Sequence, residues 1–102
     1  MRVAELSMGS HTGTHLDAPS HTVAGGRTLD QVRLEELVGD ALVLRVPDAR
    51  TGQALGEQDL GLAKLTSAPK IVVIHTGWDQ FFGSEKYLNH PFLTGSAAER
   101  LC

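Results

Sequence analysis

The chain has 102 residues, of which 41% are hydrophobic and 21% charged, and its formal net charge is −3. This composition fits one folded domain or a piece of a larger one. A chain of this size buries only about two thirds of its unfolded surface, so we expect a homo-oligomer, either a dimer or a tetramer. Because the sequence contains no cluster of Lys and Arg, we exclude nucleic acid and anionic membrane surfaces as partners.

Neither membrane insertion nor secretion is indicated. The longest apolar runs, residues 41–44 and 71–74, are far shorter than the roughly 20 residues that a bilayer-spanning helix needs. Glu5 stands where a signal peptide would be apolar. The single cysteine, Cys102, permits no intramolecular disulfide and is interpreted as an untied terminal thiol. These features predict a cytoplasmic protein.

The first third of the chain predicts one short strand and one helix. Residues 3–8 alternate in part between apolar and polar side chains, which favours a strand. Thr28 and Gln31 have the spacing of a capping box, so we predict a helix over residues 29–38. Gly39 is a typical residue to end it.

The middle of the chain predicts two strands. Residues 41–46 have the apolar character of a strand, and the polar residues 48–56 predict a loop. A weak helix is predicted over residues 57–65, weak because Gly61 interrupts it. Residues 70–76 give the best strand, since their continuous β-branched run indicates burial on both faces.

The last quarter is aromatic and turn-rich. Residues 77–92 contain four aromatic side chains that we expect to pack within the segment or at a subunit interface, namely Phe81, Phe82, Tyr87 and Phe92. Thr94 or Ser96 is expected to cap a final helix. That helix is short, so it needs packing from the rest of the chain to be stable.

Residues 11–21, "HTGTHLDAPSH", hold three of the five histidines of the chain and one aspartate. Gly13, the β-branched threonines and Pro19 all disfavour a helix here. In an extended segment, alternate side chains point to the same side. The odd-numbered residues would then share one face: His11, Gly13, His15, Asp17, Pro19 and His21. Gly13 would leave room in this row for an ion or a substrate.

Imidazoles and a carboxylate that converge are the ligand set of Zn²⁺, Mn²⁺ or Fe²⁺. A divalent ion uses the lone pairs of neutral imidazoles and the charge of Asp17. Two nitrogens and one oxygen leave positions open for water, as in a catalytic site. The alternatives are solvated surface histidines or a tag, although a tag repeats His without interruption. A triad of Ser20, His21 and Asp17 is disfavoured, since neighbours in an extended segment point apart and no G-x-S-x-G motif occurs.

This segment matches the pattern H-x-G-T-H-x-D-x-P-x-H and thereby resembles the cyclase-like metal-dependent hydrolases, the family that contains kynurenine formamidase and isatin hydrolase. "GGRTLDQV", "LEELVGDALVL" and the segment from "IVVIHTGW" to "AAERL" are also similar to that family. The resemblance implies an α/β fold, a mixed β-sheet with flanking helices of the swivelling β/β/α type. It implies that residues 1–102 form the central part of a single domain, with N- and C-terminal family segments absent.

The resemblance also implies roles for the residues. His11, His15 and Asp17 would bind one or two Zn²⁺ or Mn²⁺ ions, and His21 would be the acid/base. The implied reaction is hydrolysis of an amide: N-formyl-L-kynurenine gives kynurenine and formate in tryptophan catabolism. Two alternatives stay open, namely a hydrolase of another cyclic amide or lactone, as in isatin hydrolase, and a truncated, non-catalytic metal-binding module.

Three further residues are candidates for the substrate pocket. Thr14 offers a hydroxyl or a backbone N–H to the site, or orients a ligand. His75 ends the best strand, where the family more often carries a basic residue such as Arg, and it is either a pocket residue or a strand-end histidine. Trp78 is either a ring that stacks on an aryl substrate or a core aromatic. His90, which precedes Pro91, is interpreted as a loop residue.

Overall fold

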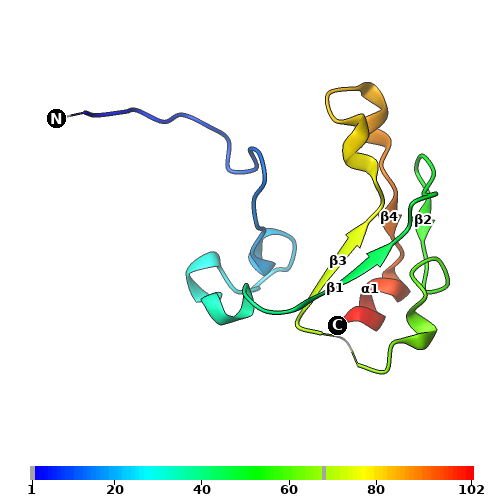
Figure 1. Cartoon of the computed structure of the whole chain (residues 1–102). Helices are drawn as coiled ribbons and strands as arrows, with labels where there is room; N and C mark the ends of the chain where they lie inside the picture. The colour runs from blue at the N-terminus through cyan, green and yellow to red at the C-terminus, as the bar shows by residue number, and fades with distance from the viewer. Residues whose placement is uncertain (1, 68) are drawn as a thin grey trace. The chain divides into compact units, whose positions relative to one another are not determined.

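The computed structural model describes residues 2–67 and 69–102 and shows a mixed α/β chain with two small parallel sheets (Figure 1). The chain divides into two compact units. Unit 1 is Met1–Leu34, of which residues 2–34 are described, and unit 2 is Glu35–Cys102.

Unit 1 contains turns and short 3₁₀ helices. The first two are η1 (Pro19–His21) and η2 (Leu29–Gln31), and η3 (Leu34–Glu36) follows at the boundary between the units. The predicted strand over residues 3–8 is wrong, since this segment is irregular (Figure 1). A lone segment gains no ladder of hydrogen bonds, because sheet stability comes from pairing with other strands.

The capping box at Thr28 is confirmed. The backbone N–H of Thr28 donates to Gln31 Oε1 at 3.1 Å, and the Thr28 side chain completes the reciprocal contact. The single helix over residues 29–38 is wrong, since the segment forms η2 and η3 with Val32 extended between them at φ −82° and ψ 122°. A short helix is marginal without a buried face, and this segment buries no residue fully.

Unit 2 is organised by the parallel pair β1 (Ala41–Arg45) and β3 (Ile71–His75), so both predicted strands are confirmed. Val43 lies opposite Val73 in the register, and both are 45% exposed. Burial of β3 on both faces is therefore wrong. Side chains alternate along a strand, and the core of unit 2 lies against one face, where Ile74 packs.

A second parallel pair, β2 (Ala54–Leu55) and β4 (Phe92–Leu93), completes the strands. β2 falls inside the segment predicted as a polar loop. The core lies among these elements, and its buried residues in the described part of the chain are Val46, Leu55, Leu60, Leu62 and Ala97. The weak helix predicted over residues 57–65 is reduced to η4 (Leu62–Lys64), because Gly61 precedes it in the left-handed conformation at φ 65°.

The final helix, α1 (Gly95–Leu101), is confirmed with Thr94 as its cap. Thr94 Oγ1 accepts a hydrogen bond from the backbone N–H of Ala97 at 3.2 Å. Ala97 is fully buried, and Arg100 donates to the Leu65 carbonyl at 3.0 Å. This packing supplies what a helix of seven residues lacks by itself.

The aromatic segment between β3 and β4 is turn-rich, as predicted, with η5 (Trp78–Phe81) and η6 (Glu85–Asn89). The rings of Phe82 and Tyr87 meet edge to face with centroids 5.4 Å apart, although Phe82 is largely exposed. Across the described residues, no helix is long and apolar enough to cross a membrane.

Candidate metal centre

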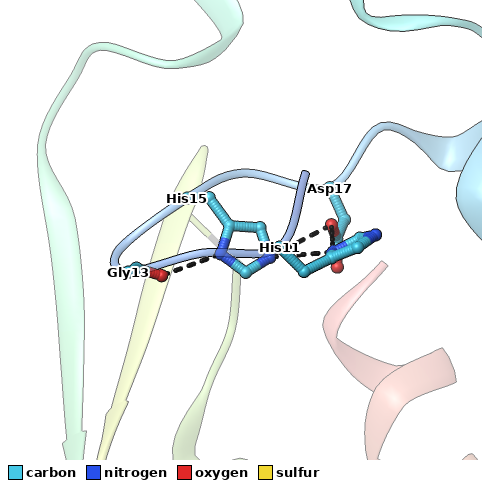
Figure 2. Close-up of polar contacts among 4 residues, drawn as sticks. All are labelled: His11, Gly13, His15 and Asp17. Carbon is cyan, nitrogen blue, oxygen red and sulfur yellow. Dashed lines mark hydrogen bonds and ion pairs between the residues drawn. The ribbon is translucent and has the colours of Figure 1, made fainter. Parts of the chain in front are cut away.

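A tight turn in unit 1 brings the two leading candidate ligands together. His11 Nδ1 and His15 Nε2 lie 3.0 Å apart (Figure 2). In an extended strand, four residues would separate their backbones by about 13 Å. The chain reverses instead at Gly13, which adopts φ 69°. The convergence predicted from the sequence is therefore present, but its predicted cause, an extended segment with all odd residues on one side, is wrong.

Asp17 completes a triangle of donor atoms. Asp17 Oδ1 lies 3.1 Å from His11 Nδ1 and 3.5 Å from His15 Nε2. These three are the group of described residues whose arrangement suits a metal ion. The structure thus brings together the three residues that the sequence predicts as ligands.

The turn also orients the imidazole of His15. Its Nδ1 lies 2.8 Å from the Gly13 carbonyl oxygen, as Figure 2 shows. A carbonyl oxygen only accepts, so Nδ1 carries the hydrogen, and the lone pair of neutral His15 is on Nε2. Nε2 is the atom that faces His11 and Asp17. A backbone carbonyl that fixes the tautomer of a histidine in this way is typical of metal ligands.

The spacing of the donor atoms fits a divalent ion. Three ligands placed about 2.0 to 2.1 Å from one tetrahedral Zn²⁺ lie about 3.3 Å from each other. The observed separations in the triangle are 3.0, 3.1 and 3.5 Å. The separations therefore fit the metal that the donor set indicates, once the hydrogen that His11 Nδ1 directs at His15 and Asp17 has moved to Nε2 of the same ring.

His21 lies beside this triangle without belonging to it. Its ring centroid is 4.3 Å from that of His11, and it ends η1. A closed turn holds this position, because the Ser20 N–H donates to the Arg27 carbonyl at 3.0 Å. Gly26 packs so closely that a Cβ there would lie 2.8 Å from the Pro19 carbonyl carbon. The acid/base role of His21 remains a prediction.

The donor side chains are open to solvent. Their exposed fractions are 46% for His11, 32% for His15 and 50% for Asp17. Open coordination positions on an ion held here would therefore be accessible to water and to a small substrate.

The three candidate pocket residues have different surroundings. Thr14 is exposed next to Gly13 in the turn. His75 is exposed at the end of β3, opposite Arg45, and its carbonyl accepts from the Val46 N–H at 2.9 Å. These contacts do not involve the candidate ligands, so the pocket roles of Thr14 and His75 remain predictions.

Trp78 is buried and makes fixed contacts within unit 2. Its indole Nε1 donates to the Tyr87 carbonyl at 3.2 Å, and its backbone N–H donates to Thr76 Oγ1 at 3.3 Å. The ring meets Phe81 edge to face at 4.8 Å between centroids. Trp78 also lines a cavity of about 320 Å³.

The other polar residues of this cavity are Thr76, Asp79, Tyr87 and His90. The sequence predicts no site role for any of them, since Tyr87 is expected to pack and His90 to lie in a loop. Asp79 and Tyr87 are eight positions apart, and no spacing rule joins them before η5 and η6 are folded. The only hint is the density of aromatic residues between the two strands.

Residues 3–102 match the family described as "Putative cyclase". A kynurenine formamidase of Salinibacter ruber is 39% identical over 46 residues, which cover 45% of this chain and 22% of the relative. That of Erythrobacter litoralis is 34% identical over 82 residues, covering 79% of this chain and 35% of the relative. That of Geobacillus thermodenitrificans is 26% identical over 78 residues, covering 76% and 36%.

No solved structure shows a significant match to the chain. The matched region spans at most about a third of the length of these curated relatives.

Proposed function

Because this chain belongs to the family described as "Putative cyclase", whose similarity covers residues 3–102, we propose that it is part of a metal-dependent amide hydrolase of the arylformamidase type. The proposed reaction is N-formyl-L-kynurenine plus water to kynurenine and formate. The observation that carries the proposal is the triangle of His11, His15 and Asp17 donor atoms. The names of three relatives, each a kynurenine formamidase, support this choice of substrate.

His11, His15 and Asp17 would hold one or two Zn²⁺ or Mn²⁺ ions. A bound divalent ion supplies two things: a lower pKa for its water, near 7, and polarisation of the substrate carbonyl. The Gly13 carbonyl keeps Nε2 of His15 free for coordination, and the carboxylate of Asp17 offsets part of the positive charge.

His21 is the proposed proton carrier. Amide hydrolysis breaks the bond between the carbonyl carbon and nitrogen, and the departing amine needs a proton that the attacking water gives up. An imidazole has a reference pKa of about 6.5, so it can accept that proton and return it at neutral pH. His21 is adjacent to His11 and exposed, which leaves its ring free to face a substrate.

The wider fold and assembly are also proposals. We assign residues 1–102 to the central part of a single cyclase domain with the swivelling β/β/α type of sheet, and we expect a homo-oligomer. The parallel pairs β1–β3 and β2–β4 support an α/β fold, and the match over a limited part of each curated relative supports a partial domain.

The test is to measure metal content and N-formyl-L-kynurenine hydrolysis together. We expect wild type to lose turnover on chelation and regain it with Zn²⁺ or Mn²⁺. Asp17→Ala should lose the metal, whereas His21→Ala should keep it and lose about 10²- to 10⁴-fold in rate. Asp48→Ala, which removes an exposed loop carboxylate, is the matched control and should behave as wild type.

If Asp17→Ala and His21→Ala both hydrolysed the substrate as well as wild type, the assigned roles would be wrong. Isatin is assayed in parallel. If the chain hydrolysed isatin and not N-formyl-L-kynurenine, the substrate would be a cyclic amide and not a linear formamide.

The exposure of the donor atoms favours one second candidate, a metal-binding module without turnover. Catalysis usually requires a site that excludes bulk water, and the three donors are between 32% and 50% exposed. This candidate predicts that the chain retains the metal with the same dependence on Asp17 but hydrolyses neither amide.

A further inference from the structure

Unit 2 has a cavity of about 320 Å³ whose lining contains neither the proposed metal ligands nor His21. Its walls come from the ends of β2, β3 and β4 and from the aromatic segment between the last two. The lining residues are Leu55, Ile74, Thr76, Trp78, Asp79, Tyr87, His90, Pro91, Phe92 and Leu93. All belong to unit 2, so the cavity is complete within that unit.

The aromatic wall of the cavity is held in place. Trp78 is buried, and the hydrogen bond from its indole to the Tyr87 carbonyl ties η5 to η6. Pro91 is also buried, and the Phe92 N–H donates to the Gln53 carbonyl at 2.9 Å. A ligand would therefore meet a largely preformed surface, which lowers the entropy cost of binding.

The size and composition of the cavity suit one aromatic ring with a short substituent. A closed apolar cavity of roughly 150 Å³ is enough to bind benzene. The cavity here has about twice that volume, at 320 Å³, and its walls are mostly apolar or aromatic. Pockets of this kind bind by burying a flat apolar group and orient it with a few polar groups.

The polar groups at the cavity favour a donor on the ligand. Asp79 is the acidic residue of the lining, and none of the described lining residues is Lys or Arg. His90 Nδ1 lies 2.9 Å from the Pro91 carbonyl and so carries the hydrogen, which leaves Nε2 as an acceptor in the neutral ring. A carboxylate and an imidazole nitrogen together attract an ammonium group. Lys86, whose Nζ lies 5.3 Å from the centroid of the Trp78 ring, lines a neighbouring cavity and not this one.

We propose that this cavity is a binding site for a small primary amine that carries one aromatic ring. The ring lies against the apolar wall with Trp78, and the ammonium group pairs with the carboxylate of Asp79. This site is separate from the metal centre, because its residues include none of the metal ligands and its ligand needs no metal, although Trp78 is also a candidate for the substrate pocket.

The chain contains one tryptophan, so its intrinsic fluorescence reports on this cavity. The full chain is titrated with phenethylamine and, separately, with phenylacetate, which has the same ring and the opposite charge. We expect a saturable change in Trp78 emission with phenethylamine and about fivefold weaker binding of phenylacetate, the size expected for a solvated ion pair.

Two variants test the recognition of charge. Asp79→Asn keeps the shape of the side chain and should reduce the preference for the amine to less than twofold. Asp48→Asn removes the same charge from an exposed loop residue outside the cavity lining and should leave the preference unchanged. Neither change removes a core side chain, since both residues are exposed, so both variants should fold.

A separate variant tests the location. Leu93→Phe places a larger side chain in the cavity and should abolish the emission change, whereas Leu88→Phe, at an exposed residue outside the lining, should not. The proposal is overturned if wild type gives no saturable change, if both probes bind equally, or if Asp79→Asn keeps the preference. Repeating the titration with a chelator separates this site from the hydrolase: binding should persist, and its loss would show that the two are one site.

Discussion

Replacing Gly13 with alanine tests how the turn builds the metal centre. Gly13 adopts φ 69°, a conformation that costs an L-residue about 1 to 2 kcal/mol. A Cβ there meets nothing within 4 Å, so the cost is conformational and not steric. If His11 and His15 converge only when this turn forms, Gly13→Ala should weaken Zn²⁺ binding by roughly 5- to 30-fold.

Competition with a chromophoric chelator measures this affinity, and two controls sharpen it. Gly13→Asn should lose less affinity than Gly13→Ala, because Asn tolerates the left-handed conformation despite its larger side chain. Gly9→Ala should have no effect, because a Cβ at Gly9 makes only an ordinary contact of 3.5 Å with Thr12. If Asn weakened binding more than Ala, Gly13 would serve to leave space for the ion, and the reasoning from the turn would be refuted.

Three further variants probe the parts of the fold that hold the two sites. Gly26→Ala should place a Cβ 2.8 Å from the Pro19 backbone and so open the turn that carries His21. We expect kcat/KM to fall while the Zn²⁺ affinity measured in the chelator assay is retained. Unchanged turnover would count against the assigned position of His21. Leu62 is 1% exposed, so Leu62→Ala should lower the free energy of unfolding of unit 2 by about 3 kcal/mol in urea. Leu88 is 79% exposed, so Leu88→Ala should lower it by less than about 0.5 kcal/mol. Equal losses would mean that the core is wrongly placed. Thr94→Ala should cost about 1 kcal/mol in the same assay through loss of the cap on α1, and Thr94→Ser should restore most of it.

Local sequence patterns predict the elements of unit 2 correctly where the predicted apolar or capping residues also contact the core or a near neighbour in the chain. β1 and β3 are apolar runs that pack on the core with one face, and Thr94 caps α1 through a contact only three residues away. The capping box at Thr28 is equally local and was predicted correctly. The helix expected after it fails, because helix propagation depends on a buried face that residues 29–38 lack.

The candidate metal centre was predicted by residue and not by geometry. The residue types and spacing predict a donor cluster of His11, His15, Asp17 and His21, and the family resemblance separates His21 from the three predicted ligands. Alternation along a strand gave the right side chains for the wrong reason, since the positive φ of Gly13 reverses the chain. Glycine permits that conformation without requiring it. The sequence alone therefore does not distinguish an extended segment, in which Gly13 leaves space between two side chains, from a turn at Gly13.

The cavity beside Trp78 lay beyond local reasoning. Its lining joins β2 to residues more than thirty positions later, through the pairing of Leu55 with Leu93. Asp79 and His90 have no sequence pattern in common. Only the packing of η5 and η6 beside β4 brings their positions together.

Zinc K-edge X-ray absorption of the Zn²⁺-loaded chain tests the central claim most directly, because it counts the imidazoles and the sulfur atoms bound to the ion. The triangle predicts two imidazole nitrogens, oxygen ligands at about 2.0 to 2.2 Å and no sulfur, with one imidazole fewer in His15→Ala. A third imidazole would make His21 a ligand and remove its proposed role. A sulfur ligand would place the ion at Cys102, and that result would contradict the metal centre described here.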